Sequence, residues 1–502
     1  MSSNTPPLSP GVNDGPSRRS WWILTVLLIG ASMSVMNATI VNVALPSMRA
    51  SLGATPAALS WIISGWALAF GLSFIPAGRL GDRIGHRRIF LLGIGLFALS
   101  SAACGMAQSV NQMIGARIVQ GIAGGLFFPT ATIYIQLLFK GAFRGKAFAV
   151  MAMVLGLASA LGPMVGGLLI SAFGAEKGWR LVFFVNLPVG LLVFVWSFFL
   201  LPKKGEIRGT AKGFDLLGLL LLTAGLSAIL VPLIEGRAQG WPAWTYMSLA
   251  SGAGFLVILA AWEKHLEHKG SFAVLPAKLF RHASFSAGVV LELVFYASFV
   301  SIFYILSLLW QSGFGNSALS TGILSVPFAF GSILGATYSA RITRAIGRQV
   351  LVIGTAALAL GLLSIALILS SMPVASISIY TLFLPLFVVG IGSGLFVAPN
   401  VQFIVATADP SDAGAAGGVV ATMQRIGTSI GLAIVGSVFW GCLDLPRGSI
   451  GRAGTAEVAN AFAHSASVAI GVCAGLAVIA TALVFSLPKF VDQHYRQARA
   501  NA

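Results

Sequence analysis

The stretch GRLGDRIGHRR, residues 78–88, lies between two long apolar runs and carries one acid, Asp82, among four arginines. Its glycines, at 78, 81 and 85, permit a tight and close-packed turn. Arginines beside an apolar run are typical of the cytoplasmic edge of a membrane, but a general excess of positive charge explains neither the single acid nor the spacing. The stretch therefore predicts a specifically built connection between two membrane-spanning helices.

The composition extends this interpretation to the whole chain. Hydrophobic residues make up 57% of the 502 residues, charged residues only 9%, and the mean hydropathy is +0.90, which excludes a soluble globular protein. An apolar run of about 20 residues crosses a hydrocarbon core of about 30 Å as a helix. We predict an all-α polytopic membrane protein with fourteen spans, whose approximate cores are 22–45, 58–77, 90–107, 113–137, 147–172, 181–201, 215–234, 245–262, 284–310, 319–339, 350–371, 376–406, 415–440 and 461–487.

The positive charges indicate how the chain is oriented. With the N-terminus in the cytoplasm, the inner segments hold 23 of the 31 Lys and Arg residues and the outer loops hold 6, while Arg117 and Arg425 lie inside spans. Both termini are then cytoplasmic, in an inner (plasma) membrane. The net charge of +17 becomes a sign of topology, so we expect the lipid bilayer, and not nucleic acid, as the partner.

The chain also repeats itself. ARITRAIGR, residues 340–348, aligns with GRLGDRIGH, residues 78–86, and keeps the turn glycine while Arg344 replaces the acid. Parallel repeats of this kind predict two six-helix halves with a binding cavity between them. The expected parts are a cytoplasmic N-terminal tail (1–20), a first half (21–202), linkers with an extra two-helix hairpin at 214–263 (203–282), a second half (283–488) and a cytoplasmic C-terminal tail (489–502). We expect the hairpin to face lipid.

The sequence has no constellation typical of an enzyme. Its three cysteines fall in separate spans without CxxC spacing, and no GxxxxGK[ST] phosphate-binding loop is present. We therefore expect no catalytic site, no metal, no cofactor and no use of ATP. An ion gradient remains as the source of energy for any transport.

Residues 78–88 resemble the signature between the second and third helices of the major facilitator superfamily. The matching positions are Gly78, Leu80, Asp82, Arg83, Gly85 and Arg87. Four more stretches are similar to marks of the fourteen-helix drug and proton antiporters of that superfamily, namely NATIVNVALP (37–46), GARIVQGIAGG (115–125), ALGPMVGG (160–167) and WRLVFFVNLP (179–188). The resemblance covers nearly the whole chain and implies a transporter that works by alternating access.

The resemblance also implies an antiporter motif in the fifth span. Small residues there let helix backbones approach closely, and a proline removes one backbone hydrogen bond, which favours a kink. The corresponding positions are Gly162, Pro163, Gly166 and Gly167. This motif favours export over import.

A gate loop is implied at residues 78–88, formed by Gly78, Asp82, Arg83, Gly85 and Arg87. Asp82 would act as a latch on the span that begins near residue 414, because the N-terminus of a helix attracts a carboxylate. Breaking that contact would open the inner side of the transporter.

Two arginines lie inside predicted spans, where a charge costs about 2.5–3.5 kcal/mol. Counted along their helices, Arg117 is roughly 6 Å deep and Arg425 roughly 16 Å deep. By the resemblance, Arg117 followed by Gln120 takes part in proton transfer by favouring the ionised form of a nearby acid; a structural role on helix-end carbonyls is the alternative. Arg425 either shapes the cavity or pairs with backbone.

Glu292 is the carboxylate well inside a span, roughly 12 Å deep. Burial favours its protonated form, while a cationic substrate or an arginine favours loss of the proton, and this opposition is a means of coupling antiport. Glu292 is therefore the candidate proton site, and Glu292 and Arg117 are the two candidate residues for proton coupling. The alternative is a glutamate that hydrogen-bonds a neighbouring helix for packing.

The candidate cavity residues are Asn37, Trp66, Gln120 and Arg425. The family that the sequence resembles usually has an aspartate at the position of Asn37, and an asparagine cannot titrate, although it can hydrogen-bond a ligand. Two interpretations are open: the proton site has moved, to Glu292, or the coupling is altered.

These features predict a secondary exporter of hydrophobic or amphipathic small molecules, lipophilic or cationic, that exchanges them for protons. We expect it to act as a monomer and to confer resistance to antibiotics. The alternatives are a solute importer of the same superfamily and an uncoupled, receptor-like relative that does not transport.

Overall fold

The computed structural model describes residues 16–139, 141–202, 215–236, 239–269, 277–280, 282–405, 413–444 and 455–489. In these ranges every regular element is helical. The helices of the first half are α1 (Arg18–Leu52), α2 (Pro56–Ile84), α3 (His86–Met106), α4 (Val110–Leu138), α5 (Gly141–Phe184) and α6 (Asn186–Leu200). The hairpin and the helix after it are α7 (Leu216–Glu235), α8 (Ala243–His268) and α9 (Ala277–Phe280). The second half contains α10 (Ala283–Phe299), α11 (Ser301–Leu308), η1 (Leu309–Gly313), α12 (Ala318–Leu324), α13 (Val326–Ile346), α14 (Gln349–Ser371), η2 (Val374–Ser376), α15 (Ile379–Val405), α16 (Ala413–Cys442) and α17 (Ala456–Val484).

The described residues contain 13 helical segments long and apolar enough to cross a membrane. One of them, Met153–Leu200, has 48 residues and would be about 72 Å long as a single helix, roughly twice the thickness of a hydrocarbon core. Gly174 interrupts it with φ 79° and ψ 164°, values that a helix does not contain. The chain turns back there, so the segment supplies two spans and the total agrees with the fourteen that the sequence predicts.

Two predicted spans are broken into pieces. The run predicted at 284–310 folds as α10, α11 and the π-helix η1, and the run predicted at 319–339 folds as α12 and α13. Both breaks lie in the second half, on either side of the connection between these two spans. A π-helical turn inside a span is common at functional positions.

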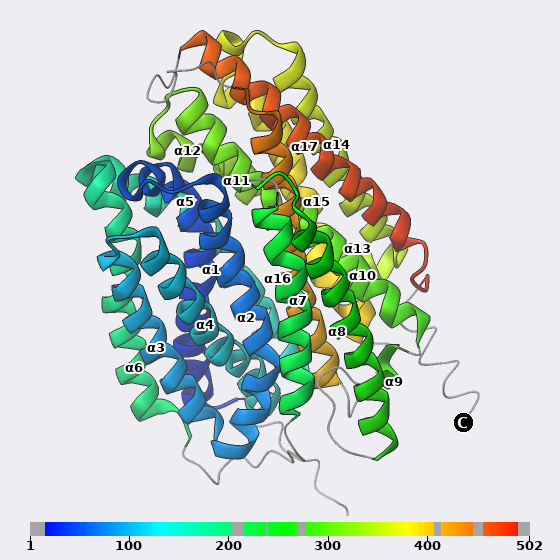
Figure 1. Ribbon diagram of the computed structural model, residues 1–502. Coiled ribbons are helices and arrows are strands. Elements are labelled where there is room, and N and C mark those ends of the chain that lie inside the picture. The colour runs from blue at the N-terminus through cyan, green and yellow to red at the C-terminus, as the bar shows by residue number, and fades with distance from the viewer. Residues whose placement is uncertain are drawn as a thin grey trace, which may run out of the picture.

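Figure 1 shows the first-half helices on one side and most helices of the second half on the other, with α12 lying above α5 and with α7 and α8 in front. The sequence expectation that the hairpin faces lipid is right only in part. Trp61 on α2 donates a hydrogen bond from Nε1 to Oε1 of Glu235 at 3.0 Å, and Ser437 on α16 donates one to the Leu233 carbonyl at 3.0 Å. Helix α7 therefore packs on both halves, whereas the span in α8 is only 17% buried.

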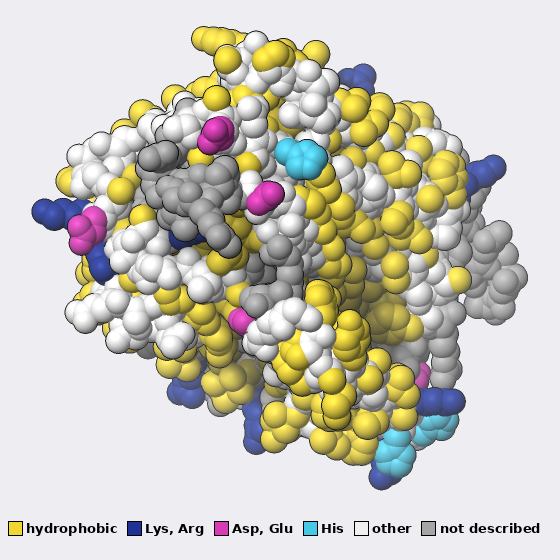
Figure 2. Space-filling view, turned by 45° about the horizontal axis from the view of Figure 1, so that its top comes forward, with side chains coloured by type: hydrophobic (Ala, Val, Ile, Leu, Met, Phe, Trp, Pro, Cys, Tyr) yellow, Lys and Arg dark blue, Asp and Glu magenta, His cyan; other side chains and the backbone are white. Residues whose placement is uncertain are grey.

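A cluster of leucines seals this contact. Leu222, Leu226 and Leu230 of α7 pack with Leu68 of α2 and Ile426 of α16. The face drawn in Figure 2 carries many hydrophobic side chains, and its charged side chains are few and scattered. Such a surface suits contact with lipid tails.

The internal repeat is visible in the backbone. Helix α2 ends at Ile84 and α13 ends at Ile346, and the next residue is a glycine with positive φ in both, Gly85 (105°) and Gly347 (60°). The amide of each glycine donates a 2.8 Å hydrogen bond back into its helix. The sequence expectation of a longer turn over residues 78–88 is corrected: the helix continues through Arg83, because helical hydrogen bonds satisfy the backbone there, and only Gly85 makes the turn.

Candidate functional site

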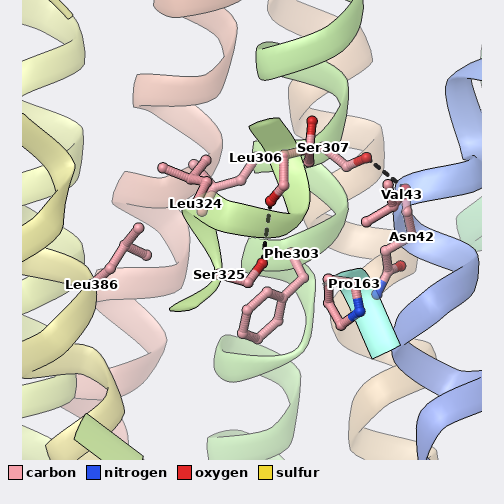
Figure 3. A pocket seen from close by; sticks show the side chains of 10 residues that line it. Asn42, Val43, Pro163, Phe303, Leu306, Ser307, Leu324, Ser325 and Leu386 are labelled. Atoms are coloured by element: carbon pink, nitrogen blue, oxygen red, sulfur yellow. Dashed lines mark hydrogen bonds between the residues drawn. The ribbon is translucent and has the colours of Figure 1, made fainter. Parts of the chain in front are cut away.

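The two halves meet closely at the end of the molecule where α1 ends and α2 begins, which the sequence predicts to be the outer end. Ser307 of α11 donates a hydrogen bond to the Asn42 carbonyl of α1 at 2.5 Å, and Gln311 donates one to the Val43 carbonyl at 3.0 Å. A small pocket lies beside these bonds, between α1, α5, α11, α12 and α15, and Pro163 and Phe303 form part of its wall (Figure 3). The outer end of the interface is therefore closed in this structure.

The antiporter motif forms part of this closed interface. A Cβ atom built on Gly162 or Gly166 would lie 2.1 Å from Thr39 Oγ1 or 2.8 Å from Ile40 Cγ1, both on α1. On its other side, a Cβ on Gly167 would lie 2.6 Å from the Ala318 carbonyl oxygen, which belongs to α12 of the second half. The small residues thus let α5 touch one helix of each half.

Pro163 belongs to the same contact. It lies inside α5, and its carbonyl oxygen would be 2.6 Å from a Cβ on Gly322 of α12. Each half therefore presents a glycine to the backbone of the other half, Gly167 to Ala318 and Gly322 to Pro163, which allows close approach of two helix backbones.

Helices α2 and α16 join the halves nearer the middle of the molecule. Ser429 of α16 donates to the Ser64 carbonyl at 3.1 Å, and Thr422 donates to the Gly71 carbonyl at 3.2 Å. This pair of helices brings Arg425, which lies between the two donors in the sequence, against the first half.

The gate-loop arginine Arg87 is bound within its own half. Its guanidinium lies 5.0 Å from the ring of Phe198 at the end of α6, and Nη2 donates to the Phe198 carbonyl. In the second half, Arg348 lies 5.6 Å from the ring of Phe485 and donates to its carbonyl at 2.8 Å. Each half thus anchors its repeated turn to its own last helix.

The structure says less about the other gate-loop positions. The Arg83 side chain is exposed. The side chains of Gly78 and Asp82, and the residues just before α16, lie outside the described residues, so the latch stays a prediction.

Arg117 lies in a fully buried polar cluster of the first half. Its Nη1 donates to Asn37 Oδ1 at 2.5 Å and to Gln120 Oε1 at 2.6 Å, and its Nε donates to the Ile62 carbonyl at 2.9 Å. Gln120 in turn donates to Ser101 Oγ at 2.6 Å. The charge is therefore surrounded by neutral oxygens.

The predicted residues Asn37, Arg117 and Gln120 thus come together, but all three are 0% exposed. They do not line an open cavity in this conformation. The guanidinium also lies 5.0 Å from the Trp66 ring, which is a favourable contact for a cation. The cluster is a buried support for Trp66, and its role in proton transfer stays a prediction.

Glu292 lies in a separate cluster of the second half. It is 0% exposed on α10, and both of its carboxylate oxygens accept hydrogen bonds from amide groups. Gln424 of α16 donates to Oε1 at 2.6 Å, and Asn400 of α15 donates to Oε2. Glu292 and Arg117 are therefore held by different partners in opposite halves.

Arg425 contacts aromatic rings. Its Cζ lies 4.2 Å from the centre of the Phe70 ring and 5.6 Å from that of Trp66. The side chain is half-buried, and in the described part of the chain it donates no hydrogen bond. In the described part of the chain its contacts are thus with rings and not with backbone oxygens, and its place among the cavity residues stays a prediction.

Sequence reasoning missed Asn400, Gln424 and Phe70. The sequence reasoning considered mainly charged residues inside the predicted spans, and these three side chains are uncharged. A polar amide inside an apolar run also needs a partner, and this signal would have pointed to Asn400 and Gln424. Their pairing with Glu292 depends on the helix packing and was not readable from spacing.

The molecule has two packed six-helix halves, buried polar clusters, and small residues at the interface between the halves. These features define a membrane transporter of the alternating-access type. The chain belongs to the Major Facilitator Superfamily, whose family model matches residues 27–432.

Several curated relatives are proteins of Streptomyces named for transport, export or antibiotic resistance. The chain is 33% identical to the "Probable actinorhodin transporter" of Streptomyces coelicolor, over 85% of this chain and 74% of that protein. It is 30% identical to the "Tetracenomycin C resistance and export protein" of Streptomyces glaucescens, over 89% and 84% of the two chains. It is also 30% identical to a puromycin resistance protein of Streptomyces alboniger, over 97% and 96%.

Solved structures agree with the fold. A bacterial homologue of the human lysosomal transporter Spinster, in an inward-facing and unoccupied conformation, superposes with a TM-score of 0.65 at 16% identity, covering 94% of this chain and 97% of that one. The xylose transporter XylE of E. coli, inward open, gives 0.63 at 14% identity, covering 95% and 99%.

Proposed function

We propose that this protein exports lipophilic or cationic small molecules, of the antibiotic class named for its relatives, across the inner membrane in exchange for protons. It acts as a monomer with both termini in the cytoplasm. The relatives named for actinorhodin, tetracenomycin C and puromycin support export as the direction.

The observation that carries the coupling is the environment of Glu292. The carboxyl group is fully buried and is held by the two amides of Asn400 and Gln424, and among the described residues no arginine or lysine is bonded to it. Burying a protonated carboxyl group costs little free energy. Burying the ionised carboxylate costs much more, unless a cation approaches it. A cationic substrate group and a proton therefore compete for Glu292, which is the requirement for antiport.

Alternating access follows from the closed outer end. The contacts of Gly167 with α12 and of Ser307 with α1 hold that end together, so the substrate enters from the opposite, cytoplasmic side. Outward opening must separate these contacts, and the predicted latch of Asp82 on α16 would then close the inner side.

The test is proton flux in proteoliposomes with an imposed pH gradient and a pH-sensitive dye inside. Puromycin is the first substrate, because it is a lipophilic amine. Wild type is compared with Glu292→Gln, and the matched control is Glu457→Gln, which changes an exposed glutamate in the first turn of α17.

We expect puromycin to trigger proton flux in wild type and in Glu457→Gln, and Glu292→Gln to lose it. Flux that survives Glu292→Gln would retain antiport and reject this proton site. Puromycin accumulation without proton flux would favour the uncoupled relative, and uptake driven in the direction of the proton gradient would favour the importer.

A further inference from the structure

Arg425 is a cation without a polar partner near the middle of the interface between the halves. Its guanidinium lies over the rings of Phe70 and Trp66, and in the described residues it makes neither a hydrogen bond nor an ion pair. The side chain as a whole is half-buried. An arginine carries five N–H donors and stays protonated in proteins, which makes this one available for an acceptor that the chain itself does not supply.

A second arginine approaches the same indole. Arg117 Cζ lies 5.0 Å from the Trp66 ring and Arg425 Cζ lies 5.6 Å from it, so the two cations are at most 10.6 Å apart, the sum of these distances. Arg117 is fully buried and its Nη2 has no partner. Positive charge is therefore concentrated around Trp66.

The buried carboxyl group of Glu292, on the second half, is not bonded to either arginine. Glu292 is bonded to Gln424, the residue before Arg425, and to Asn400, and neither arginine is among its partners. An acidic group and a cation thus lie in the same half without bonding to each other. A ligand that carries both charges would satisfy both groups and would bring no net charge into the low-dielectric interior.

The two rings that Arg425 contacts, Phe70 and Trp66, belong to a larger group of aromatic side chains. Trp66 and Phe70 lie 5.4 Å apart, Phe70 and Phe128 5.6 Å, and Phe70 and Phe74 6.1 Å, all measured between ring centres. Phe74 and Phe128 are half-buried, and on the second half Tyr296 is half-buried as well. These rings would contact a flat aromatic ligand on its faces.

We propose that the preferred substrates are aromatic zwitterions: planar ring systems with a cationic nitrogen that competes with the proton at Glu292 and an acidic group, a carboxylate or ionised phenol, that binds Arg425. The inference rests on the proposed export function and narrows its substrate class. Arg425 binds the acidic oxygens through its N–H groups while Phe70 and Trp66 hold the guanidinium in place.

The test uses two dyes that differ only in the acidic group. Rhodamine 110 has a cationic aromatic frame and a free carboxylate, and rhodamine 123 is its methyl ester, which keeps the cation and lacks the carboxylate. Binding of each dye to the full-length protein in lipid nanodiscs is measured by fluorescence anisotropy at one pH and one salt concentration. The variants are Arg425→Gln and Arg425→Lys, and the control is Arg344→Gln, which changes an exposed arginine at the end of α13.

We expect wild type to bind the free-acid dye about tenfold tighter than the methyl ester, since a charge-assisted hydrogen bond contributes about one order of magnitude or more. Arg425→Gln should remove this preference by weakening the free acid, while its affinity for the methyl ester is retained and shows that the variant is folded. Arg425→Lys should restore only part of the preference, because an ammonium lacks the planar fork. Arg344→Gln should behave as wild type.

Equal or tighter binding of the methyl ester by wild type would overturn the inference, and so would a preference that survives Arg425→Gln, or binding of neither dye. A failure of the proposed antiport function gives different results from a failure of the zwitterion inference. If the methyl ester is preferred and triggers proton flux that Glu292→Gln abolishes, antiport stands and the zwitterion inference falls. If the Arg425-dependent preference is found but neither dye moves protons, the substrate class stands and antiport falls.

Discussion

Gly167→Ala is the sharpest perturbation of the closed outer end. The added Cβ would lie 2.6 Å from the Ala318 carbonyl oxygen and 2.8 Å from Leu319 Cα, and both atoms are backbone. Ordinary contact begins near 3.4 Å, so α5 and α12 must separate by about 0.8 Å. Overpacking of this kind costs about 1–3 kcal/mol, and the cost applies only while the outer end is closed. The equilibrium should therefore shift toward the outward-open state by about 5- to 150-fold.

The assay is labelling of a single cysteine placed at Ser307, in a background without the native cysteines Cys104, Cys442 and Cys473. Ser307 is 1% exposed and bonded to α1, so a membrane-impermeant maleimide should reach it only when the outer end opens. Gly167→Ala should raise the labelling rate by the factor given above. The control is Gly156→Ala on the same helix, where nothing lies within 4 Å of the added Cβ.

Two results would refute this reasoning. In Gly167→Ala the cysteine at position 307 could be labelled at the wild-type rate while the variant still transports. The contact with α12 would then not set the equilibrium between the outward-closed and outward-open states. Gly156→Ala could instead accelerate labelling equally, in which case the effect belongs to α5 in general and not to the interface.

Two further predictions concern stability. Trp61→Phe removes the bond to Glu235 that ties α7 to α2, and we expect a loss of about 1 kcal/mol and a lower thermal unfolding midpoint, whereas Trp244→Phe, which removes an exposed bond of the same 3.0 Å length, should leave the midpoint unchanged; equal effects would mean that the tie to α2 contributes nothing. Gly85→Ala forces a side chain into φ 105° and should cost about 1–3 kcal/mol, while Gly115→Ala, in open space on α4, should not lower the midpoint; an unchanged midpoint for Gly85→Ala would contradict the strained turn.

The spans and the repeat could be predicted because they depend on local properties. Length and hydropathy suffice to find a helix that crosses a membrane, and a turn that needs positive φ needs glycine in both copies, at Gly85 and Gly347. The extent of the turn was predicted less well. Charged residues after Gly78 suggested a loop, yet a helix can continue into the interface with water as long as its backbone hydrogen bonds persist.

The partners of the embedded charges could not be predicted, because they come from other helices. Glu292 is bonded by residues 108 and 132 positions away, and no spacing rule connects such distances. The packing of α7 on both halves was missed for a related reason. An apolar helix is equally compatible with lipid and with a protein interface, so hydropathy alone does not distinguish them.

These contacts bear on the presence of Asn37 at a position where the family usually has an aspartate. Arg117 donates to the oxygens of Asn37, Gln120 and Ile62, none of which belongs to a carboxyl group. Its part in proton transfer therefore stays a prediction. Glu292, in the other half, is the buried carboxyl group that we propose as the proton site.

Glu292 is well placed to pass such a change to the interface. Its partner Gln424 is on α16, next to Arg425, and Arg425 contacts Phe70 of the first half at 4.2 Å. Helix α16 also holds α2 through Ser429. Loss of the proton strengthens the hold of Glu292 on Gln424, since a carboxylate accepts stronger hydrogen bonds than a neutral carboxyl group. One helix thus carries the proton-sensitive bond, the free cation and the contact between halves, so protonation of Glu292 can bias both substrate binding and the conformational equilibrium.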